Sequence, residues 1–315
     1  MSSLLSVKNI VKKYAGHTAL NDVSIEVPKQ SIFGLLGPNG AGKTSLIRII
    51  NQITAPDSGS ITFDGENLNP EHISQIGYLP EERGLYKKMK VGEQALYLAQ
   101  LKGMTKNEAT EKLKNWFIKY DIKDWWDKKV EDLSKGMAQK IQFITTVLHE
   151  PKLLILDEPF SGFDPINTNL IKKEILELRD KGATIIFSTH NMESVEAICD
   201  DIALINKSHK ILDGSVKEVK SAYRANIFEI SFKGNLVAFT NSLWAGGELL
   251  DSQVENDITT VKVKILGNNS PNELLTAILP KVEIISLKEI LPSMNDIFIQ
   301  KVSEINNQVE PIVAN

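Results

Sequence analysis

One short segment, residues 37–44, limits the possible folds more than any other part of the chain. It reads GPNGAGKT, which fits the pattern G-x-x-x-x-G-K-[ST]. The apolar run Ile32 to Leu36 before it predicts a strand, and the apolar-periodic stretch 45–50 after it predicts a helix. In that context the pattern forms a phosphate-binding loop. We therefore expect an α/β protein with a nucleotide site at the end of a strand.

The chemistry of this loop explains its residues. Glycines let successive backbone N–H groups point at anionic phosphates, and the following helix N-terminus adds partial positive charge. Lys43 is expected to reach the β- and γ-phosphates, and Thr44 to place its hydroxyl on Mg²⁺. An ordinary glycine-rich turn is the alternative, but such a match arises by chance in only roughly 1% of chains this long. The residues expected to bind nucleotide here are Gly37, Asn39, Gly40, Ala41, Gly42, Lys43, Thr44 and Ser45.

A second apolar strand, residues 153–156, ends in Asp157 and Glu158. In a phosphate-loop enzyme the first acid at such a strand end holds Mg²⁺. The second acid would then face the γ-phosphate, where it suits a general base or an orienter of the attacking water. Taken alone, two carboxylates before a proline are better explained as a solvated strand end. The phosphate-binding loop upstream reverses that judgement.

Composition limits the partners and the compartment. The 315 residues carry a formal net charge of −4, which argues against bulk electrostatic binding to nucleic acid or anionic lipid. The single cysteine, Cys199, excludes an intramolecular disulfide and a cysteine-based zinc cluster, and it indicates a reducing, cytosolic compartment. No stretch approaches the ~20 apolar residues that span a bilayer, and residues 1–12 do not resemble a signal peptide. Any membrane part must come from another chain.

The patterning along the chain predicts two domains. Short strands and turns occupy the first ~60 residues, helical spacing follows from about 90 to 150, and apolar strands with a connecting helix return from about 153 to 220. We expect one domain over 1–220 and an accessory α+β domain over 221–315. Strand and helix patterns in the second domain give the order βαββαβ plus a final helix, which predicts a ferredoxin-like arrangement.

Four further segments fall in a fixed order around the two halves of the site. They are Tyr14 in KYAG, LSKGM at 133–137, SGFDP at 161–165 and STH at 188–190. With the phosphate-binding loop, they resemble the ATP-binding subunits of ABC transporters over about residues 4–220. The segment 133–137 resembles the signature loop of that family, usually L-S-G-G-Q, and is the most discriminating of the four.

This resemblance implies roles for residues outside the phosphate-binding loop. Tyr14 would stack on adenine, and His190 would be the switch histidine that acts with Glu158 and Lys43 in hydrolysis. Ser134 and Gly136, before a helix expected over 138–148, would contact the γ-phosphate of ATP bound to another subunit. The resemblance therefore implies a head-to-tail dimer, either a homodimer or a pseudo-dimer with a paralogous ATPase, that encloses two ATP molecules.

The resemblance also implies a fold. A parallel-sheet core, an antiparallel β subdomain and a helical subdomain at about 86–150 would make up residues 1–220. The accessory α+β domain would follow them. The P-loop NTPase fold of ABC type is thus the expected class.

Three positions depart from the family pattern. Lys135 and Met137 replace one glycine and the glutamine of the signature loop, while Ser134 and Gly136 remain. Glu81 stands where the family has the glutamine of its Q-loop, and Glu82 is an alternative for the same role. A carboxylate can still ligate Mg²⁺, although it adds negative charge beside the triphosphate. The residues expected at the metal are therefore Thr44, Asp157 and Glu81.

Two segments narrow the resemblance further. Residues 77–86 and the tail 291–298 resemble a bacterial exporter branch that includes the sodium-efflux (NatA-type) ATPases. This implies an ATPase that powers export through an integral-membrane permease, on the cytoplasmic face of the cell membrane. The cargo stays open, and so does the choice between a regulatory, a dimer-supporting and a purely stabilising C-terminal domain.

Other classes fit less well. A soluble ABC ATPase that acts on ribosomes usually has two such units in one chain. One that acts on DNA has a long coiled coil between its phosphate-binding loop and its Asp-Glu strand, the segments that contain Lys43 and Asp157 here. The sequence has neither, and no sustained heptads appear. A small-molecule kinase with a phosphate-binding loop gives no reason for the signature loop.

Overall fold

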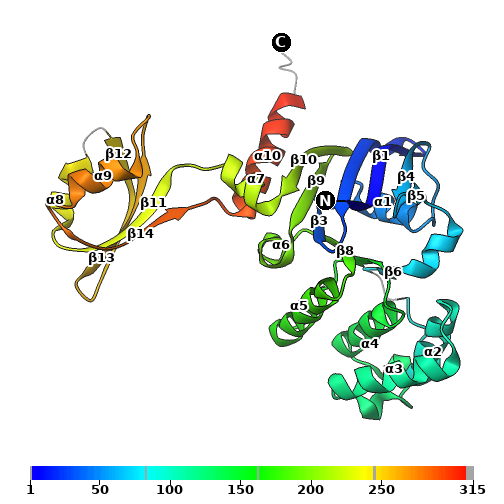
Figure 1. Cartoon of the computed structure of the whole chain (residues 1–315). Helices are drawn as coiled ribbons and strands as arrows, with labels where there is room; N and C mark the ends of the chain where they lie inside the picture. Colours follow the sequence, from blue (N-terminus) through cyan, green and yellow to red (C-terminus); the bar gives the residue numbers. More distant parts are fainter. Residues whose placement is uncertain (1, 82–83, 162, 244–245, 310–315) are drawn as a thin grey trace. The chain divides into compact units, whose positions relative to one another are not determined.

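The structure is a computed structural model that describes residues 2–81, 84–161, 163–243 and 246–309 (Figure 1). It divides into two compact units, Met1–Val216 and Lys217–Asn315. Both this division and the boundary expected at residue 220 fall at one short helix, α7 (Val216–Ala222). The two units are described separately.

A six-stranded sheet forms the centre of the first unit, in the order β10-β9-β3-β8-β7-β6. All neighbouring strands are parallel except β10, which runs antiparallel to β9. Every residue of β3, β7 and β8 is buried, as expected for parallel strands covered on both faces. Because these three strands are adjacent, the segments that leave their carboxyl ends meet at one edge of the sheet. The strand bounds are β3 (Ile32–Leu36), β6 (Ile76–Leu79), β7 (Leu153–Asp157), β8 (Thr184–Thr189), β9 (Asp201–Asn206) and β10 (His209–Ser215).

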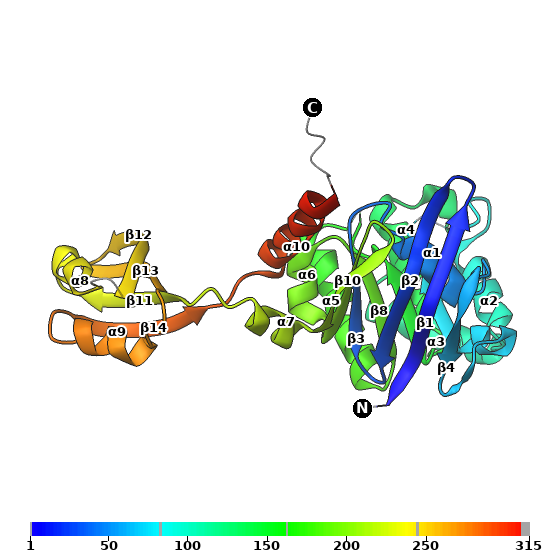
Figure 2. The same cartoon turned by 90° about the horizontal axis from the view of Figure 1, so that it is seen from above.

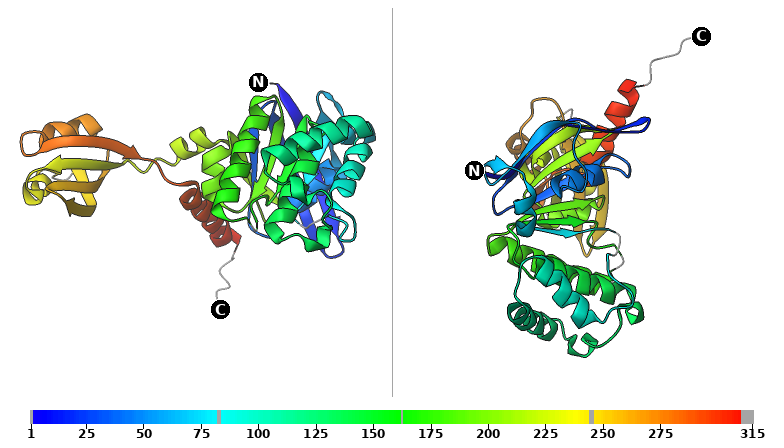
Figure 3. Two further views of the ribbon diagram at one scale, coloured as in Figure 1. Left: turned by 90° about the horizontal axis from the view of Figure 1, so that it is seen from below. Right: turned by 90° about the vertical axis from the view of Figure 1, so that its right-hand side faces the viewer.

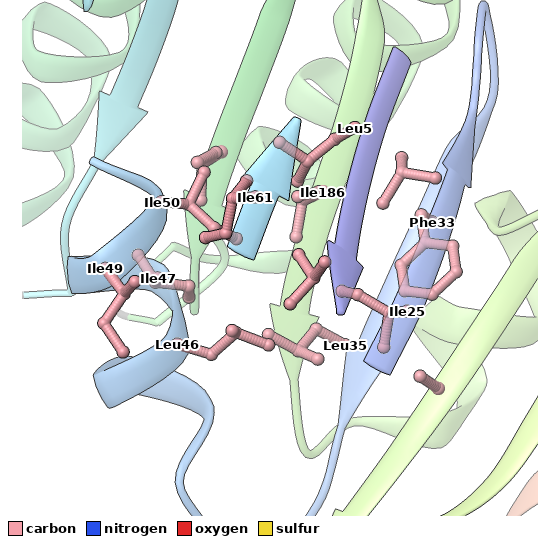
Figure 4. Packing of buried hydrophobic residues seen from close by; sticks show 14 of the residues in the cluster. Leu5, Ile25, Phe33, Leu35, Leu46, Ile47, Ile49, Ile50, Ile61 and Ile186 are labelled. Atoms are coloured by element: carbon pink, nitrogen blue, oxygen red, sulfur yellow. The ribbon is translucent and has the colours of Figure 1, made fainter. Parts of the chain in front are cut away.

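An antiparallel sheet, in the order β2-β1-β4-β5, shares one hydrophobic core with the parallel sheet. Figure 4 shows Leu5 and Ile25 of this sheet beside Phe33 and Leu35 of the parallel sheet. The apolar face of helix α1, including Leu46, belongs to the same cluster, so burial of this face orients the helix against the sheets. The bounds are β1 (Ser3–Tyr14), β2 (His17–Pro28), β4 (Ser58–Phe63), β5 (Glu66–Asn67) and α1 (Lys43–Ile50).

Three helices make up the helical part of this unit, α2 (Val91–Leu101), α3 (Lys106–Lys119) and α4 (Lys135–Val147). They lie below the two sheets in the right-hand view of Figure 3. An ion pair joins them to α5 (Pro165–Asp180), because Lys119 Nζ lies 2.6 Å from Oε1 of the buried Glu174. Short 3₁₀ turns at Pro70–Gln75, Lys123–Trp125 and Val130–Asp132 and the helix α6 (Met192–Ile198) complete the unit.

The second unit contains a four-stranded antiparallel sheet in the order β12-β13-β11-β14 (Figure 2). The alternate residues Phe228, Ile230 and Phe232 are buried against α8 and α9, and the rings of Phe232 and Phe239 stack 4.5 Å apart. The element order is the expected βαββαβ, followed by a helix. The bounds are β11 (Ile227–Lys233), α8 (Leu236–Leu243), β12 (Gly247–Glu255), β13 (Ile258–Ile265), α9 (Pro271–Ile278), β14 (Glu283–Ile290) and α10 (Met294–Val309). Across the ranges described, no helix is long and apolar enough to cross a bilayer.

Candidate active site

The phosphate-binding loop is held between β9 and β2 at positions that admit only glycine. Gly37 has φ +147° and Gly42 has φ +116°. A Cβ atom on Gly37 would lie 2.1 Å from the carbonyl oxygen of Ile205, and one on Gly42 would lie 2.3 Å from that of Ala19. Both residues therefore allow a close backbone approach that any side chain would block.

Lys43, the first residue of α1, folds back over this loop. Its Nζ donates hydrogen bonds to the carbonyl oxygens of Gly37 at 2.6 Å and Pro38 at 3.2 Å. Burial lowers the pKa of the Lys43 ammonium, while the carboxylates of Glu158 and Asp157 act in the opposite direction. The ammonium thus lies inside the loop, next to the two acids at the end of β7.

The start of α1 suits an anion. Its N-cap is a glycine, which offers no side-chain acceptor to the first N–H groups, and its first turn has no acidic residue. Those N–H groups and the positive end of the helix dipole therefore remain for a phosphate.

The two acids after β7 differ in their surroundings. Asp157 is buried, and burial raises its pKa, with a further contribution from the neighbouring carboxylates Glu81 and Glu158. Glu158 adopts φ +47°, and its carboxylate turns toward the end of β8. There it accepts hydrogen bonds from Thr189 Oγ1 at 3.1 Å and from the backbone N–H of His190 at 3.0 Å, and it contacts the His190 ring. Burial thus disfavours the ionised form of Asp157, although the Ser188 hydroxyl and the Lys43 ammonium act in the opposite direction.

A cavity of about 330 Å³ gathers most of the expected nucleotide and metal residues. Tyr14, the last residue of β1, lines it and is 43% exposed. His17 and Ala19, which belong to none of the motifs, also line it. His17 could have been predicted from the hairpin between β1 and β2, because it pairs there with Tyr14. The expected residues in the lining are Tyr14, Asn39, Gly40, Ala41, Gly42, Lys43, Thr44, Ser45, Glu81, Asp157 and Glu158.

The remaining expected residues lie outside this lining. His190 reaches the site only through Glu158, and Gly37 only through the Lys43 hydrogen bond. Ser134 is the N-cap of α4 and accepts a hydrogen bond from the backbone N–H of Met137 at 3.3 Å, while Gly136 lies near Phe163 of the segment 161–165. Glu82 and Gly162 lie outside the described residues.

The donor set suits a magnesium ion that shares its ligands with phosphate. Within the part of the chain that the structure describes, no three His, Cys, Asp or Glu side chains converge as a metal site. Mg²⁺ does not need such a cage, because it keeps several waters and is held by one or two carboxylates plus phosphate oxygens. Asp157, Glu81 and the hydroxyl-bearing Thr44 line one cavity, and the raised pKa of Asp157 indicates a carboxylate that a cation would stabilise.

Comparison with known proteins agrees with this geometry. Residues 20–161 match the family model described as ABC transporter, and residues 214–302 match the model described as ATP-binding protein DrrA1-3-like, C-terminal domain. A model described as AAA domain, putative AbiEii toxin, Type IV TA system, matches residues 129–196, within and beyond the first match.

Individual proteins and a solved structure match as well. The uncharacterized ABC transporter ATP-binding protein YhaQ of Bacillus subtilis is 40% identical over 302 residues, which cover 96% of this chain and 99% of that protein. The ABC transporter ATP-binding protein NatA of the same organism is 33% identical over 223 residues, 70% of this chain and 91% of that protein. A solved structure of an ATP binding subunit of an ABC transporter aligns with a TM-score of 0.66 at 28% identity, over 70% of this chain and 93% of that one.

These matches confirm the expected fold class, an α/β P-loop fold of ABC type. The family implies binding and hydrolysis of ATP, which is the chemistry that a phosphate-binding loop facing two carboxylates can perform. The chain belongs to the ABC transporter ATP-binding proteins, and it is an ATPase of that family.

Proposed function

We propose that this chain is the ATP-hydrolysing subunit of an ABC exporter and works as a head-to-tail dimer bound to an integral-membrane permease. One observation carries the ATPase part of the proposal. A single cavity brings an exposed tyrosine, an anion-binding loop and a pair of carboxylates together, although they come from three separate parts of the chain. This set of groups matches the base, the phosphates and the metal-bound end of one nucleotide.

The nucleotide residues take their roles from this arrangement. Adenine would stack on Tyr14, and the backbone N–H groups of residues 39–45 would hold the phosphates together with Lys43. Magnesium would be held by Thr44, Asp157 and Glu81, and it would neutralise the charge that develops on the phosphates. The geometry of the lining supports these assignments, since each of these residues faces the same cavity.

Hydrolysis would depend on Glu158 as the residue that orients the attacking water and accepts its proton. The hydrogen bonds from Thr189 and His190 fix the direction of its carboxylate. His190 would therefore be a positioning residue that keeps Glu158 aligned during the reaction.

The dimer is proposed from the residues that the cavity leaves out. Ser134 and Gly136 lie at the first turn of α4, where a hydroxyl and free N–H groups suit a phosphate, yet neither lines the cavity of their own chain. A second chain in head-to-tail orientation would present them to the γ-phosphate. That chain would be a second copy or a paralogous ATPase.

Export, membrane placement and the C-terminal role are proposed from the family and from the second unit. The family members named above are ATP-binding proteins of ABC transporters, so a permease is the expected partner and would hold this chain at the inner face of the cell membrane. The net charge of −4 argues against a nucleic-acid partner. The strand order of the second unit supports a ferredoxin-like accessory domain. A soluble ABC ATPase acting on ribosomes or DNA is the alternative.

A capture experiment distinguishes these two functions. The full chain would carry an affinity tag in its native host, and the proteins that co-purify from detergent-solubilised membranes would be identified by mass spectrometry. We expect a multi-span membrane protein in stoichiometric amount. Ribosomal or DNA-repair proteins without a membrane partner would instead support the alternative.

A further inference from the structure

A loop remote from every motif is bonded to the end of β1. Asp57, just before β4, places Oδ1 3.0 Å from Lys12 Nζ, and its Oδ2 accepts a hydrogen bond from the backbone N–H of Lys13 at 2.6 Å. The backbone N–H of Asp57 donates in turn to the carbonyl oxygen of Val11 at 2.9 Å. These three contacts join one carboxylate residue to three consecutive residues of β1.

The same contacts lead to the ring of Tyr14. Lys12 Nζ lies over this ring, 5.5 Å from its centroid, which is the geometry of a cation–π contact. The Lys12 side chain is only 13% exposed, so the ammonium is held between the carboxylate and the ring. One face of the ring is thereby covered, and a planar base can stack on the opposite face.

This end of β1 needs such support because its strand pairing is irregular. The register with β2 shifts between Ile10 and Lys12 and again between Lys12 and Lys13, and the pairing with β4 ends at Val11. Register shifts also occur nearer the start of β1, but there β2 and β4 flank the strand on both sides, whereas beyond Val11 the described ladder holds Tyr14 from the β2 side alone. Hydrogen bonds from the Lys13 N–H and the Lys12 ammonium keep the pKa of Asp57 below its usual range, so its carboxylate is ionised at neutral pH.

We propose that Asp57 is a positioning residue for the nucleotide base, acting through Lys12 and Lys13 to hold the Tyr14 ring ready for stacking. The inference rests on the proposed nucleotide site and adds a residue to its recognition of the base. It requires that Asp57 affects the binding of the base and leaves the binding of the phosphates unchanged.

The test separates the base from the phosphates by using two ligands. Calorimetric titration of the full chain would give the Kd of MgATP and of magnesium tripolyphosphate, which has no base. We expect Tyr14→Ala to weaken MgATP about tenfold, since stacking on one aromatic ring is worth about that much. Asp57→Ala should weaken MgATP roughly 3- to 10-fold, and tripolyphosphate should bind all variants equally.

Three further variants complete the design. The double variant of Asp57→Ala and Tyr14→Ala should bind MgATP no more weakly than Tyr14→Ala alone, because both act on one contact. Lys12→Met removes the ammonium but keeps the hydrogen bond from the Lys13 N–H to Asp57. Its affinity for MgATP should therefore fall less than that of Asp57→Ala. Asp64→Ala is the matched control, since Asp64 is ion-paired to Lys29 at 2.6 Å and Lys152 at 3.1 Å but does not line the cavity. Its two Kd values should equal those of the wild type.

Several results would overturn the inference. One is an unchanged Kd for MgATP in Asp57→Ala, and another is an equal loss of affinity for MgATP and tripolyphosphate in that variant. A third is a double variant in which the two losses of MgATP affinity add. A wild-type chain that binds tripolyphosphate as tightly as ATP would remove the stacking role of Tyr14 and the inference with it. A wild-type chain that binds neither ligand would overturn the proposed function itself, which distinguishes the two failures.

Discussion

The ring Nδ1 of His190 lies 2.7 Å from Oε1 of Glu158, and the two residues follow neighbouring parallel strands of the central sheet. The Glu158 side chain is 14% exposed and that of His190 is 66% exposed, so a largely exposed ring contacts a largely buried carboxylate. We therefore expect different effects when each side chain is removed. Loss of the carboxylate should stop the chemistry, and loss of the ring should loosen its alignment.

Glu158→Gln keeps the shape of the side chain and removes the proton acceptor. ATP hydrolysis should fall by about 10²- to 10⁴-fold, the range typical of a general base, while ATP still binds. If the dimer forms as proposed, an ATP-bound dimer should also accumulate. Phosphate release and size-exclusion chromatography with ATP would measure both effects. Glu177→Gln changes a glutamate that pairs with Lys119 and serves as the control. Unchanged turnover in Glu158→Gln would remove this residue from catalysis.

His190→Ala removes the ring but leaves the backbone N–H that also donates to Glu158. We expect kcat to fall by at least about tenfold with little change in KM, because positioning acts on the reacting state more than on binding. His209→Ala is the matched control, since this exposed histidine contacts Asn21 and does not line the cavity. Equal kinetics in the two variants would argue against a role for His190.

Two glycines of the phosphate-binding loop should respond differently to alanine. At Gly42 the added Cβ would lie 2.3 Å from the Ala19 carbonyl oxygen, whereas at Gly40 it would meet no atom within 4 Å. Both residues have positive φ, so both variants carry some backbone strain. Gly42→Ala should therefore lose more stability, on the order of 1–3 kcal/mol beyond Gly40→Ala. Urea unfolding of both variants would measure this, and equal midpoints would contradict it.

The sequence predicted the parts of the site that local patterns encode. The strand over residues 32–36 has the predicted bounds because it is continuously apolar and ends in the loop motif. The helix expected from residue 138 begins instead at Lys135, because Ser134 caps it and the first turn contains no apolar pattern that could reveal this. A serine at the N-cap is a start signal, but the apolar period alone places the start of the helix one turn too late.

What the sequence did not reveal comes from contacts between distant segments. Asp57 belongs to no motif, and its importance to Tyr14 follows only from the packing of its loop on β1. The binding of Glu158 by Thr189 likewise depends on the adjacency of β7 and β8. Strand order is a tertiary property, so these partners could not be derived from spacing alone.

The last prediction concerns Asp157, whose pKa is raised mainly by burial. A carboxyl whose pKa is higher in the folded state than in the unfolded state destabilises the fold wherever it is ionised in both. Asp157→Asn should therefore raise the melting temperature of the chain without magnesium and nucleotide at pH 7–8. The gain should shrink as the pH falls through the raised folded pKa and vanish near the unfolded value of 3.8.

The same substitution should abolish Mg²⁺-dependent hydrolysis, so that stability and activity change in opposite directions at one residue. Calorimetric melting in EDTA from pH 8 down to about pH 4, with ATPase assays at pH 7.5, would measure the two effects. Asp64→Asn is the control, because hydrogen bonds from Lys29 and Lys152 lower the pKa of Asp64 and its neutralisation should not raise the melting temperature. A lower melting temperature for Asp157→Asn in EDTA would show that the Asp157 carboxylate supports the fold. Its burial would then have to be compensated by the Ser188 hydroxyl and the Lys43 ammonium, the two groups that act against the rise of its pKa.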